Sequence, residues 1–174
     1  AIRRQRQMCI RDSKYNGGVP KAETGKENLE ALEKGLPNLL QHVSNITTVY
    51  KLPCVVAINR FPTDTEAELK LIETKCRELG VNVALSEVWG KGGEGGVELA
   101  KEVIRLCEQP NDFTFSYELN CSIKEKIEAI AKKIYHADGV NFTANAEKQI
   151  KTLTELGYDH MPICLSLIHI SEPT

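Results

Sequence analysis

The sequence predicts an α/β fold in which helices flank a parallel sheet in three layers. Two observations carry this prediction. Short apolar runs alternate with helical patterns along the chain, and two of the runs enclose one helix, as in a strand–helix–strand unit. The composition agrees, because 174 residues with 41% apolar and 26% charged side chains are ordinary for a globular protein with its own core.

Charge and hydropathy exclude other classes of protein. The formal net charge is -2, which argues against a nucleic-acid surface covering the whole chain. The sequence holds neither a signal-peptide pattern nor a run of about 18 apolar residues. We therefore expect no nucleic-acid partner, no membrane association and a soluble, cytoplasmic protein.

The first predicted element is a helix that begins at Thr24. Thr24-Gly-Lys-Glu27 has the pattern of a capping box, and apolar residues recur at helical spacing over residues 29–49. Gly35 and Pro37 interrupt this run. We expect a kink or a break there, with Pro37 in the first turn of a second segment.

A strand–helix–strand unit follows. Residues 53–59 are a continuous apolar run between turn residues, typical of a strand buried on both faces. A second capping box, Thr63 with Glu66, begins a helix that ends at Gly80. Residues 81–85 return as another strand, parallel to the first and joined by a right-handed crossover. The first turn of the helix is expected to hold acids that favour its dipole and need no catalytic role: Asp64, Glu66 and Glu68.

Residues 86–96 are predicted to form a glycine-rich loop that leads into another helix. Five of the seven residues from 90 to 96 are glycine. Such a loop can cradle a phosphate before a helix, or be a flexible or ligand-gated segment, and both interpretations stay open. It is not a Walker A motif, because Lys91 is followed by Gly92 and no G-x-x-x-x-G-K-[ST] string occurs in the sequence.

The last third of the chain is predicted to contain two helices and a final strand. A third capping box, Ser122 with Glu125, precedes the first of these helices, and the second runs from about Asn145 to Gly157. Residues 113–117 alternate and fit either a short strand or an extended connection. Residues 161–164 are expected to add one more strand.

The two ends of the chain are interpreted apart from the rest. Residues 1–14 hold five basic groups and a single acid, and residues 1–13 look like translated sequencing-adapter read-through. Residues 165–174 resemble the same kind of artefact. We therefore expect residues 1–13 and 165–174 to be non-native and base the functional interpretation on residues 14–164.

A candidate site lies after the two strands of the parallel unit, because ligands bind beyond the carboxyl ends of such strands. Phe61 and Trp89 follow the first and second strand on polar loops, where a flat ligand could stack between them. The same rings could instead plug the edge of the sheet. The four histidines and six cysteines have no metal-ligand spacing, so no metal site is predicted.

The sequence segments around Phe61 and Trp89 resemble those of formate–tetrahydrofolate ligases. The resemblance rests on residues 56–68 and 84–96 and extends over residues 14–164. It implies an ATP-dependent ligase that activates formate as formyl phosphate and passes the formyl group to tetrahydrofolate, giving 10-formyltetrahydrofolate and ADP. Implied substrates are formate, tetrahydrofolate and ATP with Mg²⁺, without a prosthetic group, and the parent enzyme is expected to be a homo-oligomer.

The resemblance also implies roles for particular residues. Its folate pocket would consist of Phe61, Pro62, Leu85 and Trp89. Asn59 and Ser86 would contact the nucleotide, on analogy with a P-loop NTPase-like fold.

The resemblance further implies an incomplete enzyme. The family's phosphate-binding loop and the arginine for formyl phosphate are expected upstream, so no catalytic residue is assigned here. We expect residues 14–164 to be a partial α/β ligase region that carries the folate pocket and is inactive alone. The alternative is a non-enzymatic α/β module that binds a protein partner through the glycine-rich loop and the exposed aromatics.

Overall fold

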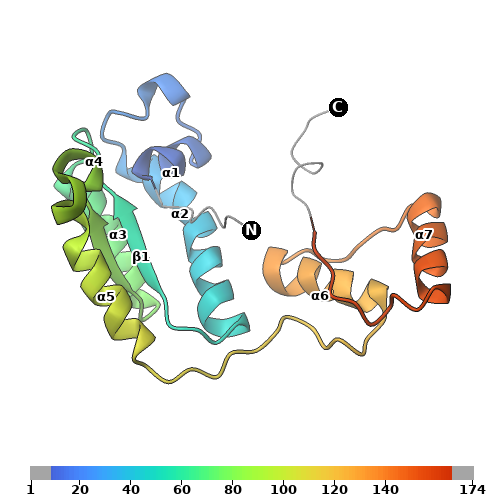
Figure 1. Ribbon diagram of the computed structural model, residues 1–174. Helices are drawn as coiled ribbons and strands as arrows, with labels where there is room; N and C mark the ends of the chain where they lie inside the picture. The colour runs from blue at the N-terminus through green and yellow to red at the C-terminus, as the bar shows by residue number, and fades with distance from the viewer. Residues whose placement is uncertain (1–8, 166–174) are drawn as a thin grey trace. The chain divides into compact units, whose positions relative to one another are not determined.

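The computed structural model describes residues 9–165, which divide into an N-terminal unit up to Phe113 and a C-terminal unit from Thr114 (Figure 1). Of the two segments expected to be non-native, residues 1–8 and 166–174 lie outside the described residues. Within residues 9–165, no helix has both the length and the apolar character needed to span a bilayer.

A parallel pair of strands forms the centre of the N-terminal unit. β1, Val55–Asn59, and β2, Asn82–Ser86, align with Val55 opposite Asn82. α3, Glu66–Glu78, connects them, which confirms the predicted strand–helix–strand unit. The sheet has two strands within the described residues.

Helices flank both faces of this sheet. Val56 and Ile58 point to one face and join a core with apolar residues of α2 and α3. On the other face, Asn82 Nδ2 donates a hydrogen bond to Glu102 Oε1 of α5, Val97–Cys107, at 2.8 Å. The mixed α/β class is therefore confirmed. The core cluster consists of Ile10, Leu32, Leu36, Val43, Val56, Ile58, Leu69, Ile72, Cys76 and Val81.

α3 begins two residues later than predicted. Its N-cap is Thr65, whose Oγ1 accepts from the Glu68 N–H at 3.3 Å, while Glu68 Oε2 accepts from the Thr65 N–H at 3.2 Å. The predicted box of Thr63 and Glu66 is wrong because the sequence repeats the threonine-to-glutamate spacing two residues on. Asp64 thus precedes the helix and does not lie in its first turn.

α2, Leu29–Ser44, also begins later than predicted. Asn28 is its N-cap, with Oδ1 accepting from the Ala31 N–H at 2.9 Å. Thr24 instead ends a 3₁₀ turn, η1, Lys21–Glu23, and its hydroxyl donates to Lys21 O at 3.0 Å. The capping box expected at Thr24 is therefore wrong.

Of the kink or break expected in this helix, the break is wrong, because α2 runs through both Gly35 and Pro37 and no second segment starts at Pro37. A Cβ on Gly35 would lie 1.8 Å from Ser13 O of α1, Ile10–Asn16, so the glycine permits the close approach of two helices. An interior proline costs about 3 kcal/mol. Burial of Leu32, Leu36 and Val43 on the apolar face offsets that cost. α1 extends across residue 13, and the expected boundary there stays a prediction.

The remaining elements of this unit are short helices. A π-helical stretch, η2, Asn45–Val49, continues α2. The predicted glycine-rich loop is wrong, because α4, Val88–Lys91, and a 3₁₀ helix, η3, Gly92–Gly96, occupy most of it. Both lead directly into α5.

The C-terminal unit contains two helices and two extended segments. α6, Ile123–Tyr135, begins at the predicted capping box of Ser122 and Glu125, and α7, Ala144–Glu155, confirms the last predicted helix. The strand predicted over residues 161–164 is wrong, because Ile163 does not pair with another strand. The Ile163 N–H instead donates to the Tyr117 hydroxyl at 2.9 Å, and the same hydroxyl donates to Ile163 O at 3.2 Å. Residues 113–117 form the extended connection, not a strand.

A candidate ligand site at the carboxyl edge of the sheet

The carboxyl ends of β1 and β2 meet at one edge of the sheet. Asn59 and Ser86, the last residues of the two strands, lie opposite each other in the register. The Arg60 N–H donates to Ser86 O at 3.0 Å, which extends the pairing by one residue. Both segments expected to bind a ligand therefore start side by side.

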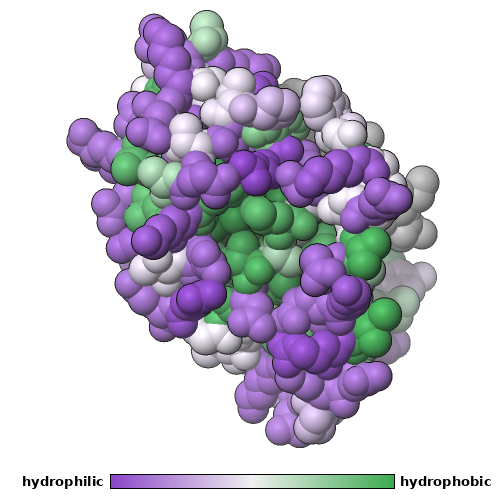
Figure 2. Space-filling model, turned by 90° about the vertical axis from the view of Figure 1, so that its left-hand side faces the viewer, coloured by the Kyte–Doolittle hydropathy of each residue, from purple (hydrophilic) through white to green (hydrophobic). Residues whose placement is uncertain are grey.

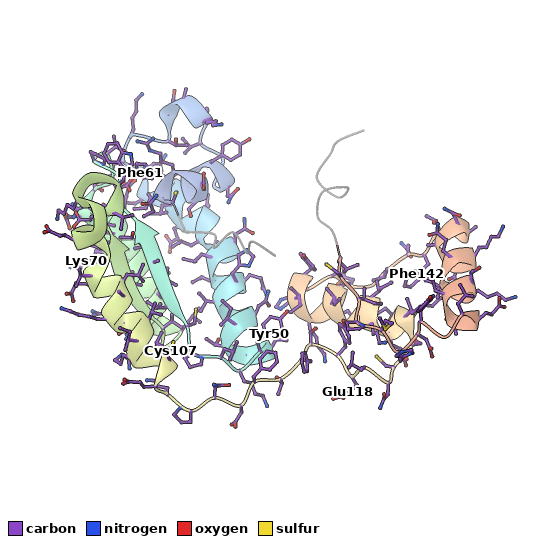
Figure 3. All side chains as sticks on the ribbon, in the orientation of Figure 1. Tyr50, Phe61, Lys70, Cys107, Glu118 and Phe142 are labelled. Atoms are coloured by element: carbon purple, nitrogen blue, oxygen red, sulfur yellow. The ribbon has the colours of Figure 1, made fainter. Side chains whose placement is uncertain are left out.

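The rings of Phe61 and Trp89 contact each other above this edge. Their centroids are 6.3 Å apart and their planes are tilted by 43°, within the range of an attractive aromatic pair. Figure 3 shows Phe61 at the end of the sheet where α4 lies. Trp89 is 69% exposed, so its ring has room to turn. A flat ligand held between the rings needs about 7 Å, twice a van der Waals contact of about 3.5 Å.

Phe61 is held by a turn that ends at Asp64. Asp64 Oδ2 accepts from the Phe61 N–H at 2.8 Å, and the Asp64 N–H donates to Phe61 O at 3.0 Å. Pro62 and Thr63 lie exposed at the tip of this turn, whereas Asp64 is buried. Burial raises the pKa of the Asp64 carboxyl. The proline at the second position of the turn is the sequence signal for it.

The remaining predicted site residues lie on both faces of β1 and β2. Ser86 Oγ is buried and has no hydrogen-bond partner within residues 9–165. Asn59 Nδ2 donates a weak bond to Cys9 Sγ at 3.9 Å. Leu85 is half-exposed at the same edge, and strand alternation turns it to the face opposite Ser86.

Arg60 links the two loops through charges that the sequence analysis missed. Its Nη2 lies 2.5 Å from Glu66 Oε1, and its Nη1 lies 3.8 Å from Glu87 Oε1. Lys91 Nζ donates to Glu87 Oε2 at 2.7 Å, and this hydrogen bond lowers the pKa of Glu87. Only the fold brings these residues together, since Arg60 and Glu87 follow different strands.

The glycine-rich stretch folds back onto the start of α4. The Glu87 N–H donates to Gly95 O at 2.9 Å. A Cβ on Gly95 would lie 2.5 Å from the Glu87 carbonyl carbon, so only glycine fits this approach. The segment between Glu87 and Gly95, which this contact closes into a turn, carries Trp89 on α4.

Arg11 also contacts the Phe61 ring. Its guanidinium carbon lies 4.9 Å from the centroid of the Phe61 ring, and its Nη2 donates to Thr63 Oγ1 at 2.9 Å. Arg11 belongs to the segment expected to be non-native, and no role was predicted for it. Nowhere in residues 9–165 do three or more His, Cys, Asp or Glu side chains gather in an arrangement that could hold a metal ion.

Fold and site together define an α/β protein with a pair of aromatic rings beyond the carboxyl ends of its parallel strands. A family model described as formate–tetrahydrofolate ligase matches residues 7–172. The chain therefore belongs to the formate–tetrahydrofolate ligase family, which confirms the resemblance found in its sequence. The family implies ATP and tetrahydrofolate as substrates in general.

Proposed function

We propose that this chain provides the folate-binding part of an enzyme that joins formate to tetrahydrofolate. The observation that carries the proposal is the contact between Phe61 and Trp89 at the carboxyl edge, in a chain of this family. The pteridine and its aryl neighbour would lie between the two rings. Pro62 and Leu85 would border them as apolar walls.

Binding between the rings requires a small movement. The centroids are 6.3 Å apart and the planes are tilted by 43°, so the rings must turn parallel and separate to about 7 Å to admit a flat ring at van der Waals distance. Trp89 can supply this movement because it is exposed and lies on the short helix α4. Each stacked ring contributes about 0.5–1.5 kcal/mol beyond the burial of its area.

Ser86 and Asn59 are proposed contacts for the adenine of ATP. The buried Ser86 hydroxyl without a partner supports this role, because a buried polar group is costly until it is hydrogen-bonded. The P-loop NTPase-like character of the fold belongs to the same proposal. Homo-oligomerisation, a cytoplasmic location and the absence of a nucleic-acid partner stay predictions.

The proposed reaction of the complete enzyme has two transfers. Formate attacks the γ-phosphorus of ATP, giving formyl phosphate and ADP. The folate amine then takes the formyl group and releases phosphate. Phosphoryl transfer needs a cradle of cations and N–H groups around the moving charge. We assign that cradle, with Mg²⁺, to a sequence outside residues 14–164, and expect no ATP- and formate-dependent product from the chain alone.

Calorimetric titration with tetrahydrofolate tests the pocket. Phe61→Ala should weaken the affinity about tenfold, since it removes one stacked ring together with its buried area. The matched control is Phe115→Ala, which removes an exposed phenylalanine of the C-terminal unit and should leave the affinity unchanged. Equal affinities of all three proteins would refute the pocket.

A second candidate function is binding of a protein partner through the same edge. The exposure of Val88 and Trp89 on α4 favours it. The two candidates differ in an observable result. A protein-binding module would give no saturable heat of binding in a calorimetric titration with tetrahydrofolate. Light scattering would detect its complex with the protein partner.

A further inference from the structure

We propose that Asp64 is a positioning residue of the folate pocket, whose carboxylate holds Phe61 in the orientation that meets Trp89. The inference rests on the proposed function and deepens it. It names the group that prepares the pocket before any ligand arrives.

The geometry of the turn is the first support. Two hydrogen bonds run in opposite directions between Phe61 and Asp64, one from the Phe61 N–H to Oδ2 at 2.8 Å and one from the Asp64 N–H to Phe61 O at 3.0 Å. They fix the peptide groups on both sides of Phe61. Pro62 adds a locked φ angle within the same turn. The direction of the Phe61 side chain is therefore set by the backbone and by Asp64.

The second support is the base on which the turn rests. Glu68 Oε2 accepts from the N–H of Thr65, the residue after Asp64, at 3.2 Å. Glu68 Oε1 in turn accepts from Lys14 Nζ at 2.8 Å, and both side chains are fully buried. Lys14 Nζ also donates to Lys26 O at 2.9 Å. Asp64 is thus anchored at its C-terminal side by a buried ion pair.

The third support is the state of the carboxylate itself. Asp64 is 6% exposed, and its Oδ1 has no hydrogen-bond partner within the described part of the chain. A buried acceptor left without a partner costs stability. The turn therefore keeps an aspartate at some cost to folding, which is typical of residues retained for a site.

The consequence for binding follows from pre-organisation. Without the carboxylate, the turn would lose one of its two cross-links, and the Phe61 ring would sample orientations that do not face Trp89. A ligand would then have to select the competent fraction, and its apparent affinity would fall by that fraction. The loss should appear in the dissociation constant for folate even where the unfolding midpoint is kept.

The test compares Asp64→Ala, Asp64→Asn and the control Glu73→Ala in the full chain. Glu73 is an acid farther along α3 that pairs with Arg77, outside the ring pair and its turn. Hydrogen exchange of the Phe61 amide reports the hydrogen bond directly, and tetrahydrofolate calorimetry reports the affinity. Asp64→Ala should speed exchange and weaken affinity, each about tenfold, the effect of losing about 1.4 kcal/mol. Asp64→Asn keeps an acceptor oxygen and should retain most of the slow exchange and most of the affinity. Glu73→Ala should change neither quantity.

The outcomes separate the inference from the proposed function. Tight folate binding by both the wild type and Asp64→Ala would overturn the positioning role and leave the pocket standing. Unchanged exchange of the Phe61 amide in Asp64→Ala would overturn it as well. A wild-type chain that binds no folate would contradict both the proposed function and the inference. If Asp64→Ala fails to fold, Asp64→Asn decides, because an affinity as low as that of Phe61→Ala contradicts the role of the acceptor oxygen.

Discussion

At the scale of single residues, a buried ion pair supports the loop that carries Phe61. Lys14 and Glu68 are both fully buried, 2.8 Å apart, and Glu68 Oε1 also accepts from the Asn28 N–H at 3.1 Å. The pair therefore ties α1 and the start of α2 to α3. A buried pair of this kind matters most when one partner is lost, because the other charge stays behind.

Lys14→Met should accordingly lower the free energy of unfolding by about 3–5 kcal/mol. Urea denaturation measures this change. The control Lys34→Met removes a lysine from an exposed i,i+4 pair with Glu30, where ion pairs contribute little. Equal unfolding curves for the two variants would contradict the account, and Lys14→Met combined with Glu68→Gln should recover part of the loss.

The pH dependence of Asp64 gives a second prediction at this scale. Burial, the largest cause, raises the pKa of Asp64 above 3.8; Glu68 raises it further, and the Phe61 N–H, Lys14 and Arg11 lower it. The folded chain thus binds this proton more tightly than the unfolded chain. The stability that protonated Asp64 contributes is fully present below pH 3.8. It is lost as the pH rises from 3.8 through the higher pKa that Asp64 has in the folded chain.

Asp64→Asn should therefore be more stable than the wild type at neutral pH, with a gap that widens as pH rises through this window. Urea midpoints of both proteins across the acidic and neutral range measure the gap. A constant difference at all pH values would show that Asp64 titrates normally.

At the scale of elements, the turn that carries Trp89 depends on a close backbone approach. Gly95 has no space for a Cβ beside the Glu87 backbone, whereas Gly93, two residues earlier in η3, has nothing within 4 Å. Gly95→Ala should displace α4 and weaken tetrahydrofolate binding about tenfold, as overpacking typically costs about 1–3 kcal/mol. Gly93→Ala is the matched control and should bind as the wild type does. Equal affinities of the two variants would refute the structural role of this turn.

The capping box of Ser122 and Glu125 predicted the start of α6 correctly, whereas the boxes expected at Thr24 and Thr63 placed the starts of α2 and α3 too early. The sequence Thr63-Asp-Thr-Glu66 offers two boxes offset by two residues, and the structure uses Thr65 because Asp64 is engaged by Phe61. A kink or a break was expected at Gly35 and Pro37, yet α2 continues through both residues with its apolar face buried. Local patterns therefore predicted the longer helices and the parallel pair of strands, and tertiary contacts decided where α2 and α3 begin. The same patterns failed over residues 88–96, which are helical, and over residues 161–164, which form no strand.

In the candidate site, too, some residues could be predicted from the sequence and others could not. Phe61 and Trp89 could be predicted to meet, because both follow parallel strands whose ends share one edge. Asp64, Glu87 and Gly95 could not be predicted, since their roles depend on hydrogen bonds and close approaches that only the folded loops create.

At the scale of the whole molecule, apolar surface is exposed on the N-terminal unit. Figure 2 shows hydrophobic side chains gathered in a hollow on the face where α3, α4 and α5 lie. α5 has no buried residue, and its Val103 and Ile104 are 42% and 59% exposed. The two-stranded sheet described here also has unpaired edges. Such surfaces promote association.

We therefore expect the isolated chain to associate as its concentration rises. Ile104→Lys should reduce this association without changing tetrahydrofolate affinity, because α5 places Ile104 outside the ring pair. Static light scattering measures the effect. A wild-type chain that stays monomeric at high concentration would contradict the prediction.

The central claim is that Trp89 and Phe61 hold a folate between them, and Trp89 reports this directly as the only tryptophan in the sequence. The most direct measurement is its fluorescence during titration with tetrahydrofolate, in the wild type and in Phe61→Ala. The account predicts a saturable change in emission for the wild type, with a midpoint shifted about tenfold upward in Phe61→Ala. A wild-type emission that does not change, or an identical midpoint in both proteins, would contradict it.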